Sequence, residues 1–353
     1  MNNLNPGPEM IKVGINGFGR IGKLVFRLIH ERNDMEVVAV NDPMMMRALV
    51  HLLKYDTVHG GFGHQVKGDE HENMLLVNGQ RIKKYARFHP DKIPWNDHGV
   101  DVVIESSGVF LTRDVLQGHL KNGVKKVILS CPPKEPLDHM VVIGLNENTL
   151  TSDHVIISNA SCTTNCIAPV MKVIDAYAGI DRGMMNTVHP YTNSQNVMDA
   201  PHTDLRRARC ANENIIPTTT SAIRAVRDVM PQMKDRFDGF ATRVPVSDGS
   251  FVELNAVLKR TVTRSEINDL FYEAARREMR GIIQYCEDPV VSSDIVGNPH
   301  SAIFDSLSTK VLGGDFIQVL AWYDNEYGYS SRLVELIGLL LKPGSDHSSQ
   351  PGQ

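Results

Sequence analysis

The chain has 353 residues, of which 42% are hydrophobic and 22% are charged, a composition typical of a soluble globular protein long enough for two domains. Its formal net charge of -4 argues against a dedicated nucleic-acid-binding protein, which would normally be basic. Five cysteines are an odd and small number for this length, which argues against a disulfide framework and favours the reducing cytoplasm.

The sequence offers no segment for export or for a membrane. The first ten residues lack the charged and apolar regions of a signal peptide, and the longest apolar stretch, near 333–341, is too short to span a bilayer. No pair of cysteines or histidines has the spacing of a zinc site with its other ligands, so no metal site is predicted. The terminal segments 1–9 and 343–353 are polar and rich in glycine and proline, and we expect them to be disordered.

The first half of the chain alternates strand and helix patterns. Short apolar or β-branched runs alternate with segments whose apolar residues recur at helical spacing. This alternation predicts a mostly parallel, doubly wound sheet. In chain order, the predicted elements are a strand at 11–16, a helix at 20–32, strands at 35–42 and 101–108, a helix at about 112–121 and a strand at 125–130.

A glycine motif joins the first predicted strand to the first predicted helix. Gly17, Gly19 and Gly22 form GFGRIG, a GxGxxG in the strand-to-helix context that a Rossmann-type dinucleotide site requires. The glycines permit a tight turn, the approach of a pyrophosphate and close packing of helix on strand. The pyrophosphate would lie at the helix N-terminus, where N–H groups and the helix dipole favour an anion.

Asp42 ends the next predicted strand, 20 residues after Gly22. A carboxylate there can bind the ribose hydroxyls of a dinucleotide and would repel a 2′-phosphate, so NAD is favoured over NADP. The alternative is a structural glycine turn in which Asp42 merely caps a helix.

The second half of the chain has a different pattern of strands and helices. Long β-rich segments at 239–260 and 315–325 are separated by helical patterns rather than alternating with them one by one. This predicts an α+β domain with a mostly antiparallel or mixed sheet. We therefore expect an NAD-binding domain at 10–160, completed by a C-terminal helix at 326–342, and a catalytic domain at 161–325. Helices are predicted at 161–179, 220–230 and 263–279.

The stretch SNASCTTNC, residues 158–166, places Cys162 among small polar residues at the start of a helix pattern. Backbone N–H groups and the helix dipole there favour a thiolate. A thiolate can add to an aldehyde, and loss of a hydride then leaves a thioester, with a base such as histidine removing the hydroxyl proton. The alternative is an inert buried cysteine, which is how we interpret Cys166, because it leads into an apolar run.

Several longer motifs follow the cysteine in a fixed order. SNASCTTNC is followed by TVHPYTNSQ, DLRRARCANENIIPTTTSA, RVP and WYDNEYGYSSR. With the glycine motif, this pattern resembles the phosphorylating glyceraldehyde-3-phosphate dehydrogenase family from about Lys12 to Leu340. The resemblance implies a Rossmann domain and a catalytic domain, a homotetramer, and oxidation of D-glyceraldehyde 3-phosphate with NAD and inorganic phosphate to 1,3-bisphosphoglycerate.

The resemblance also implies a role for each residue that matches a functional position of the family. For catalysis these are Cys162 as nucleophile and His189 as general base. For the cofactor they are Arg20, Ile21 and Asp42 at the adenine half, Ser107, Gly108 and Ser130 along the groove, and Asn325 at the nicotinamide carboxamide. For anions they are Thr192 and Arg243 at the substrate phosphate, and Ser161, Arg207 and Thr220 at the attacking inorganic phosphate.

Ser221 departs from the family, which usually has glycine after the threonine matched by Thr220. A side chain crowds a site where backbone closely approaches an anion, unless its hydroxyl serves as a donor. We expect Ser221 to crowd the attacking phosphate.

Three other functions stay open. Erythrose-4-phosphate dehydrogenase is a sister activity on a longer aldehyde, and the altered anion sites are compatible with another phospho-aldehyde. A non-catalytic binding or adhesion relative is the third, and the presence of both Cys162 and His189 counts against it.

Overall fold

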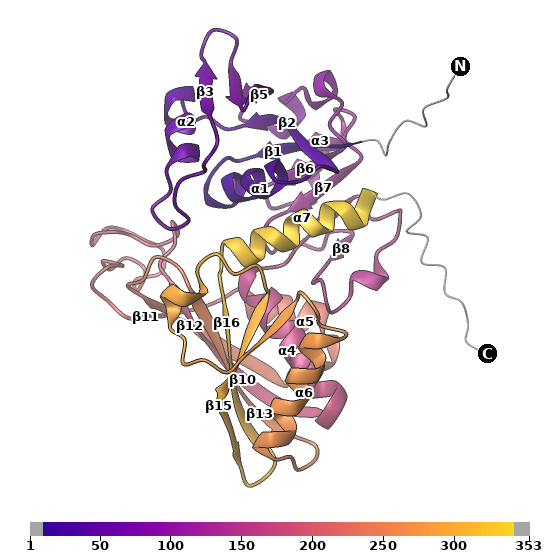
Figure 1. The fold of residues 1–353 in the computed structure, drawn as a ribbon, viewed down its shortest axis with the longest axis vertical. Coiled ribbons are helices and arrows are strands. Elements are labelled where there is room, and N and C mark those ends of the chain that lie inside the picture. The colour runs from indigo at the N-terminus through magenta and orange to yellow at the C-terminus, as the bar shows by residue number, and fades with distance from the viewer. Residues whose placement is uncertain (1–9, 342–353) are drawn as a thin grey trace, which may run out of the picture. The chain divides into compact units, whose positions relative to one another are not determined.

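The computed structural model describes residues 10–341, which form two compact units (Figure 1). Within that range, the first unit takes residues 10–140, Asn148–Asn159 and residues 333–341. The second takes Val141–Glu147 and Ala160–Arg332. The predicted disorder of 1–9 and 343–353 concerns residues outside the described range.

The described part of the first unit is built on a nine-stranded sheet in the order β3-β4-β5-β2-β1-β6-β7-β9-β8. The strands from β5 to β8 pair in parallel, and β3 and β4 add an antiparallel edge. The strands are β1 (Ile11–Asn16), β2 (Met35–Asn41), β3 (Val66–Asp69), β4 (Met74–Val77), β5 (Gln80–Tyr85), β6 (Val102–Glu105), β7 (Lys126–Leu129), β8 (His139–Met140) and β9 (Ile156–Ser158).

The central strands of this sheet are buried, and most of their residues are apolar. Every residue of β6 and β7 is buried, as is the second half of β1. Continuous burial of this kind is typical of a parallel sheet between helices. Fully buried Trp95 packs with residues of β2, β6 and β7 in one apolar cluster. The helices are α1 (Arg20–His30), α2 (Met46–Lys54), α3 (Arg113–Leu120) and the part of α7 (Tyr327–Leu341) that begins at Leu333.

The described part of the second unit contains a seven-stranded mixed sheet in the order β11-β12-β10-β13-β16-β15-β14. The pairs β10–β12 and β14–β15 are parallel, and the remaining pairs are antiparallel. The strands are β10 (Ile180–Pro190), β11 (Ile216–Thr218), β12 (Phe237–Val244), β13 (Ser250–Leu258), β14 (Ile283–Cys286), β15 (Ala302–Leu312) and β16 (Phe316–Tyr323).

Three helices pack against this sheet, and Figure 1 shows them gathered beside it. The longest, α4, begins where the Ser161 hydroxyl accepts the N–H of Thr164 at 3.0 Å. Another, α6, begins with a capping box in which Thr263 and Glu266 bind each other's backbone N–H. The helices are α4 (Cys162–Ala178), α5 (Ala222–Val229) and α6 (Arg264–Arg276). The short 3-10 helices within residues 10–341 are Pro90–Lys92, Trp95–His98, Glu147–Thr149, Pro231–Met233 and Ser292–Ile295.

The predicted fold class, a Rossmann-type α/β domain and an α+β domain with a mixed sheet, is confirmed. The predicted strand 101–108 is wrong at its end, because β6 stops at Glu105, where the side chain of that residue binds the following backbone. The predicted β-rich segment 239–260 is two strands, β12 and β13, separated by a turn.

Two segments group differently from the domains predicted from sequence. Val141–Glu147 belongs to the second unit, where Lys172 Nζ on α4 donates to Gly144 O at 2.8 Å. The C-terminal helix is divided after Arg332, so only its later part groups with the first unit. Across residues 10–341, no helix is both long and apolar enough to cross a membrane.

Candidate functional site

The glycine turn after β1 in the first unit has the shape of an anion cradle. A Cβ on Gly17, whose φ is +89°, would lie 2.4 Å from Ser107 N, and one on Gly22 would lie 2.1 Å from Gly17 O. Both positions therefore require glycine. A Cβ on Gly19 would meet no described atom within 4 Å, and no described side chain caps the start of α1. The turn thus leaves the helix N-terminus open to a pyrophosphate.

Asp42 lies beside this turn. One of its carboxylate oxygens accepts the N–H of Phe18 at 2.7 Å, and the other accepts the N–H of Met44 at 2.8 Å. The N-cap of α2 is Met45 and not Asp42, so Asp42 is not the cap residue that the alternative interpretation requires. These contacts fix the carboxylate next to the glycines, where a ribose adjoining the pyrophosphate would lie.

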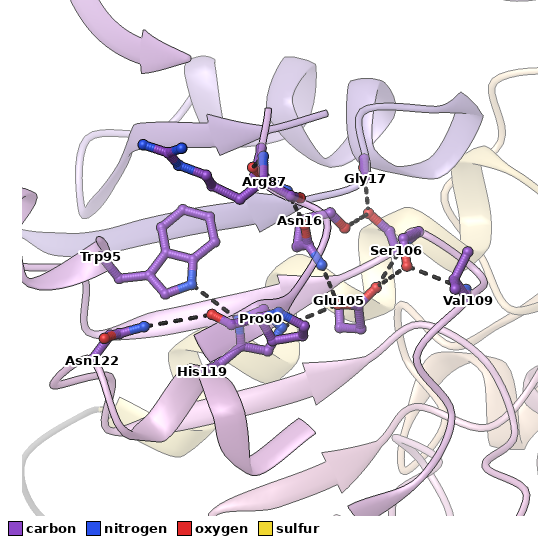
Figure 2. A network of polar contacts seen from close by, with 12 residues as sticks. Asn16, Gly17, Arg87, Pro90, Trp95, Glu105, Ser106, Val109, His119 and Asn122 are labelled. Atoms are coloured by element: carbon purple, nitrogen blue, oxygen red, sulfur yellow. Dashed lines mark hydrogen bonds and ion pairs between the residues drawn. The ribbon is translucent and has the colours of Figure 1, made fainter. Parts of the chain in front are cut away.

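The loop after β6 meets the same edge of the sheet, because β6 pairs with β1. Ser106 Oγ donates to Gly17 O at 2.7 Å, a contact drawn in Figure 2. Gly108 has a φ of +72° with open space around it, and Ser130 N–H donates to Glu105 O at 3.0 Å. The residues predicted along the cofactor groove are thus brought to the carboxyl edge of the parallel strands, the usual ligand-binding edge.

The two residues predicted at the start of α1 have different surroundings. The guanidinium of Arg20 forms an ion pair with Asp56, whose pKa the N–H groups of Val58 and His59, with Arg20, lower to about 2 against the effect of burial. Ile21 is half-buried. Arg20 is therefore held in a fixed orientation at the rim of the cradle.

Cys162 and His189 meet in the second unit. Cys162 is the first residue of α4, and His189 is near the end of β10. Their Sγ and Nε2 atoms are 3.6 Å apart, within hydrogen-bond distance for sulfur. The other ring nitrogen, Nδ1, lies 2.9 Å from Pro190 O and 2.5 Å from a guanidinium nitrogen of Arg243. The thiol and the imidazole predicted from distant motifs therefore form a pair.

Burial sets the charge of this pair. It raises the pKa of the Cys162 thiol, and Arg243 and contacts at Thr163 oppose it in part. Burial, and after it the Arg243 guanidinium, lowers the pKa of His189 to about 3. Both shifts favour the neutral forms of the two groups. Burial therefore works against the thiolate that the sequence predicts from the helix N-terminus alone.

Asn325 follows β16, and its position is fixed by a strand next to it. It is buried, and Ser250 Oγ at the start of β13 donates to Asn325 Oδ1 at 2.7 Å. That bond occupies the amide oxygen from one side and turns the NH2 group away from Ser250. An amide held in this way suits recognition of another amide, such as a carboxamide.

The residues predicted to bind phosphate groups lie in separate surroundings. Arg243 lies against His189 and donates to Pro190 O at 2.8 Å, whereas Thr192 Oγ1 contacts Ser194 Oγ at 2.8 Å. No described atom accepts from the buried Nε of Arg243. The hydrogen bonds of Arg243 therefore bring it to the catalytic pair, and none of those described joins it to Thr192.

Arg207 is held beside the other predicted anion residues. It donates to Thr218 Oγ1 at 2.8 Å and to Thr219 O at 2.9 Å, and lies 3.4 Å from Asp204. Thr220 Oγ1 accepts the N–H of Ala222 at 3.2 Å. These bonds fix the guanidinium next to the segment that contains Thr220.

Ser221 is exposed with an ordinary φ of -70°, and its side chain makes no capping bond to α5. The backbone at this position therefore does not itself require glycine. Ser161, the residue before the nucleophile, caps α4, because its hydroxyl oxygen accepts the N–H of Thr164.

Sequence reasoning missed Tyr323, which ends β16 and is buried. Its hydroxyl lies 2.9 Å from both Thr163 Oγ1 and Thr187 Oγ1, and its ring meets that of His189 edge-on, with centroids 6.2 Å apart. These contacts join α4, β10 and β16 behind the catalytic pair. Its place in the WYDN motif, two residues before Asn325, is the signal that could have revealed it.

Comparison with known proteins decides the family. Residues 161–325 match the sequence model described as glyceraldehyde 3-phosphate dehydrogenase, C-terminal domain, and residues 11–113 match its NAD binding domain. The chain is 52% identical over 335 residues to glyceraldehyde-3-phosphate dehydrogenase of Thermotoga maritima, which covers 94% of this chain and 100% of that protein. It is 48% identical over 336 residues to glyceraldehyde-3-phosphate dehydrogenase 1 of Bacillus cereus, covering 95% of this chain and 100% of that protein.

The chain belongs to the glyceraldehyde 3-phosphate dehydrogenase family. This confirms the resemblance inferred from the motifs. It also confirms NAD as the cofactor, because the matched NAD binding domain contains the glycine cradle and Asp42.

Proposed function

We propose that the chain oxidises D-glyceraldehyde 3-phosphate with NAD and inorganic phosphate, forming 1,3-bisphosphoglycerate through a thioester on Cys162. The observation that carries this proposal is the Cys162–His189 pair, with Sγ and Nε2 3.6 Å apart. The chain is also about half identical, over nearly its whole length, to glyceraldehyde-3-phosphate dehydrogenases. A neutral thiol beside a neutral imidazole is a nucleophile with its base already in place.

Cys162 and His189 carry the proposed proton transfers. The thiol proton moves to Nε2 as Sγ bonds to the aldehyde carbon, and the carbonyl oxygen then takes that proton to give a hemithioacetal. Bound NAD supplies the hydride acceptor. Nε2 removes the hydroxyl proton as the hydride leaves, the carbonyl re-forms as a thioester, and attack by phosphate releases the thiolate.

The tautomer of His189 follows from this role. Nε2 accepts a proton from the thiol only if the ring hydrogen is on Nδ1. Nδ1 then donates to Pro190 O at 2.9 Å, and the Arg243 nitrogen that lies 2.5 Å from Nδ1 has to direct its hydrogens elsewhere, one of them to the same carbonyl at 2.8 Å. Proton gain at Nε2 makes the ring cationic, which the adjacent guanidinium disfavours, so the base readily gives the proton up again.

Two groups of residues are proposed for the phosphates. Arg243 and Thr192 would bind the phosphate of the substrate, and the buried Nε of Arg243, which lacks an acceptor among the described atoms, is a donor suited to an anion. Arg207, Thr220 and Ser161 would bind the attacking phosphate next to Ser221, which would crowd it, and the fixed guanidinium of Arg207 supports this site.

We assign the glycine cradle, Asp42 and the groove residues of the cofactor site to the first unit, and catalysis and the carboxamide contact of Asn325 to the second. We infer a cytoplasmic homotetramer from the family resemblance. Light scattering of the purified chain tests the assembly, and a monodisperse monomer would contradict it. Fractionation of the cell in which the chain is native tests the compartment.

The activity itself is tested with a panel of phospho-aldehydes and NAD, with and without inorganic phosphate. We expect turnover with D-glyceraldehyde 3-phosphate to exceed that with erythrose 4-phosphate and to require phosphate. Cys162→Ser is the matched control and should lower turnover by about four orders of magnitude or more, the typical loss of a covalent nucleophile.

The alternatives give other results in the same assay. Preference for the tetrose, or for another phospho-aldehyde, would replace the proposed substrate. Turnover that is indifferent to phosphate would exclude a phosphorylating dehydrogenase, and no turnover with any aldehyde would favour a non-catalytic relative.

A further inference from the structure

Three neighbouring strands of the first sheet end on polar side chains at the same level. Asn41 ends β2, Asn16 ends β1 and Glu105 ends β6, and Asn16 is in register with each of the other two. At most 3% of any of the three is exposed. We call these three residues the polar row. Each strand continues directly into a segment that the proposed function assigns to the cofactor.

The hydrogen bonds along the polar row run in one direction. The backbone N–H of Arg87 donates to Asn41 Oδ1 at 2.7 Å, so the NH2 group of Asn41 points the other way and donates to Asn16 Oδ1 at 2.7 Å. Asn16 Nδ2 then donates to Glu105 Oε2 at 2.5 Å. Because a backbone N–H can only donate, neither amide can be reversed without setting donor against donor.

A second line of donors reaches Glu105 through Trp95 and His119 (Figure 2). Trp95 Nε1–H, which can only donate, bonds to His119 Nδ1 at 3.0 Å. The ring hydrogen of His119 is therefore on Nε2, which lies 3.1 Å from Glu105 Oε2. Trp95, His119 and Glu105 are all 0% exposed. His119 is thus a neutral donor, and Glu105 must accept.

A third line of donors comes from Ser107, in the loop that follows β6. The backbone N–H and the hydroxyl of Ser107 donate to Glu105 Oε1 at 2.9 and 2.5 Å. The preceding residue, Ser106, donates to Gly17 O in the glycine turn. The loop 106–109 is therefore tied on one side to the carboxylate and on the other to the cradle.

We propose that Glu105 is the residue that positions the loop 106–109 for NAD, because it is the single acceptor at which these three lines of donors meet. Only a carboxylate has acceptors on both sides and no hydrogen of its own. The inference rests on the proposed function, which makes Ser107 and Gly108 part of the cofactor groove. Glu105 does not contact the cofactor itself in this arrangement, and acts through the loop.

Glu105→Gln tests this role with almost no change in volume. Its new NH2 group faces either the donors Asn16 and His119 or the donor Ser107, so one line of donors is broken. We expect the Kd for NAD, measured by titration calorimetry without substrate, to rise about tenfold, equivalent to about 1.4 kcal/mol. Glu36→Gln is the matched control, since Glu36 accepts from an amide on the same sheet at the other end of β2, and it should bind NAD as the wild type does.

A compensating variant separates positioning from simple loss of stability. Asn16→Asp together with Glu105→Gln moves the carboxylate one place along the polar row, where it accepts from Asn41 and from the new amide at position 105. The oxygen of that amide still accepts from Ser107, so the loop contact is kept and only the His119 donor stays unmatched. This double variant should recover most of the lost NAD affinity. Asn16→Asp alone puts two carboxylates side by side and should bind NAD more weakly than either the wild type or the double variant.

The outcomes are distinct when thermal unfolding is followed in parallel. An unstable Glu105→Gln protein whose folded fraction binds NAD with the wild-type Kd would overturn the inference, since the residue would then be structural only. If Glu105→Gln does not fold, the double variant decides: near wild-type affinity supports the inference and a Kd raised tenfold contradicts it. A wild-type protein that fails to bind NAD would instead overturn the proposed function.

Discussion

The carboxyl edge of the first sheet is fully buried and the catalytic pair of the second unit joins a half-buried thiol to a buried imidazole, and the polar groups of these two regions have opposite hydrogen-bonding patterns. Glu105 accepts hydrogen bonds from Asn16, Ser107 and His119 and has a partner on each oxygen. Cys162 and His189 share one long contact of 3.6 Å, and burial shifts the pKa of each toward its neutral form.

The difference follows from what each region does. A binding edge gains affinity when its loops are fixed before the ligand arrives, so donors and acceptors there are matched in full. A nucleophile and its base must exchange protons, so neither can be locked into one protonation state by strong partners. The positioning residue Glu105 therefore has short bonds on both oxygens, whereas the reacting atoms, Sγ of Cys162 and Nε2 of His189, share one long contact.

The largest effect that would test this difference is expected at His189, the proposed base of the catalytic pair. Replacing it with asparagine should slow hydride transfer by about two to four orders of magnitude, the usual worth of a general base. NAD affinity should stay near that of the wild type, because the cofactor edge is built in the other unit. Stopped-flow reduction of NAD gives the rate and calorimetry gives the Kd. Loss of the folded protein, seen by circular dichroism, would show instead that His189 is mainly structural.

The same residue predicts how stability depends on pH. With a folded pKa of about 3 and an ordinary value near 6.5, His189 binds a proton in the unfolded chain well before it does so in the folded one. Its contribution is present in full above about pH 6.5 and is lost as the pH falls toward 3. Between pH 6.5 and 5 the loss should be about 2 kcal/mol of unfolding free energy, at about 1.4 kcal/mol per unit.

Urea unfolding at several pH values measures this slope, with the His189→Asn protein as the reference. The wild type should lose more stability toward acid than the variant does. Parallel slopes would mean that burial does not hold His189 neutral, and the contrast between the two regions would disappear.

The smallest effect is expected at Ser221. Its ordinary backbone and exposed side chain leave room for adjustment, so Ser221→Gly should lower the Michaelis constant for inorganic phosphate by only about twofold, as for other exposed sites. The constant for the aldehyde should not change. Initial rates at varied phosphate measure both, and weaker phosphate binding in the glycine protein would make the serine a ligand rather than an obstruction.

Local patterns were enough to predict part of this molecule. The positions of Gly17, Gly22 and Asp42 predict a cradle because their spacing encodes a strand, a turn and a helix, each read within a few residues of chain. The start of α4 at Cys162 is likewise a local property, since Ser161 caps the helix in place. The end of β6 was missed because it depends on a side chain, Glu105, that binds the backbone after it.

The sequence by itself determined the family, the nucleotide motif and the chemistry of a thiol with a histidine base. The tertiary structure alone decided the charge of that pair, because desolvation depends on everything packed around Cys162 and His189 and not on their neighbours in the chain. It also decided that Glu105 accepts from three directions. Asn16 and His119 are 89 and 14 residues away from it, and hydrogen-bond direction is set only once such distant donors are brought to one carboxylate.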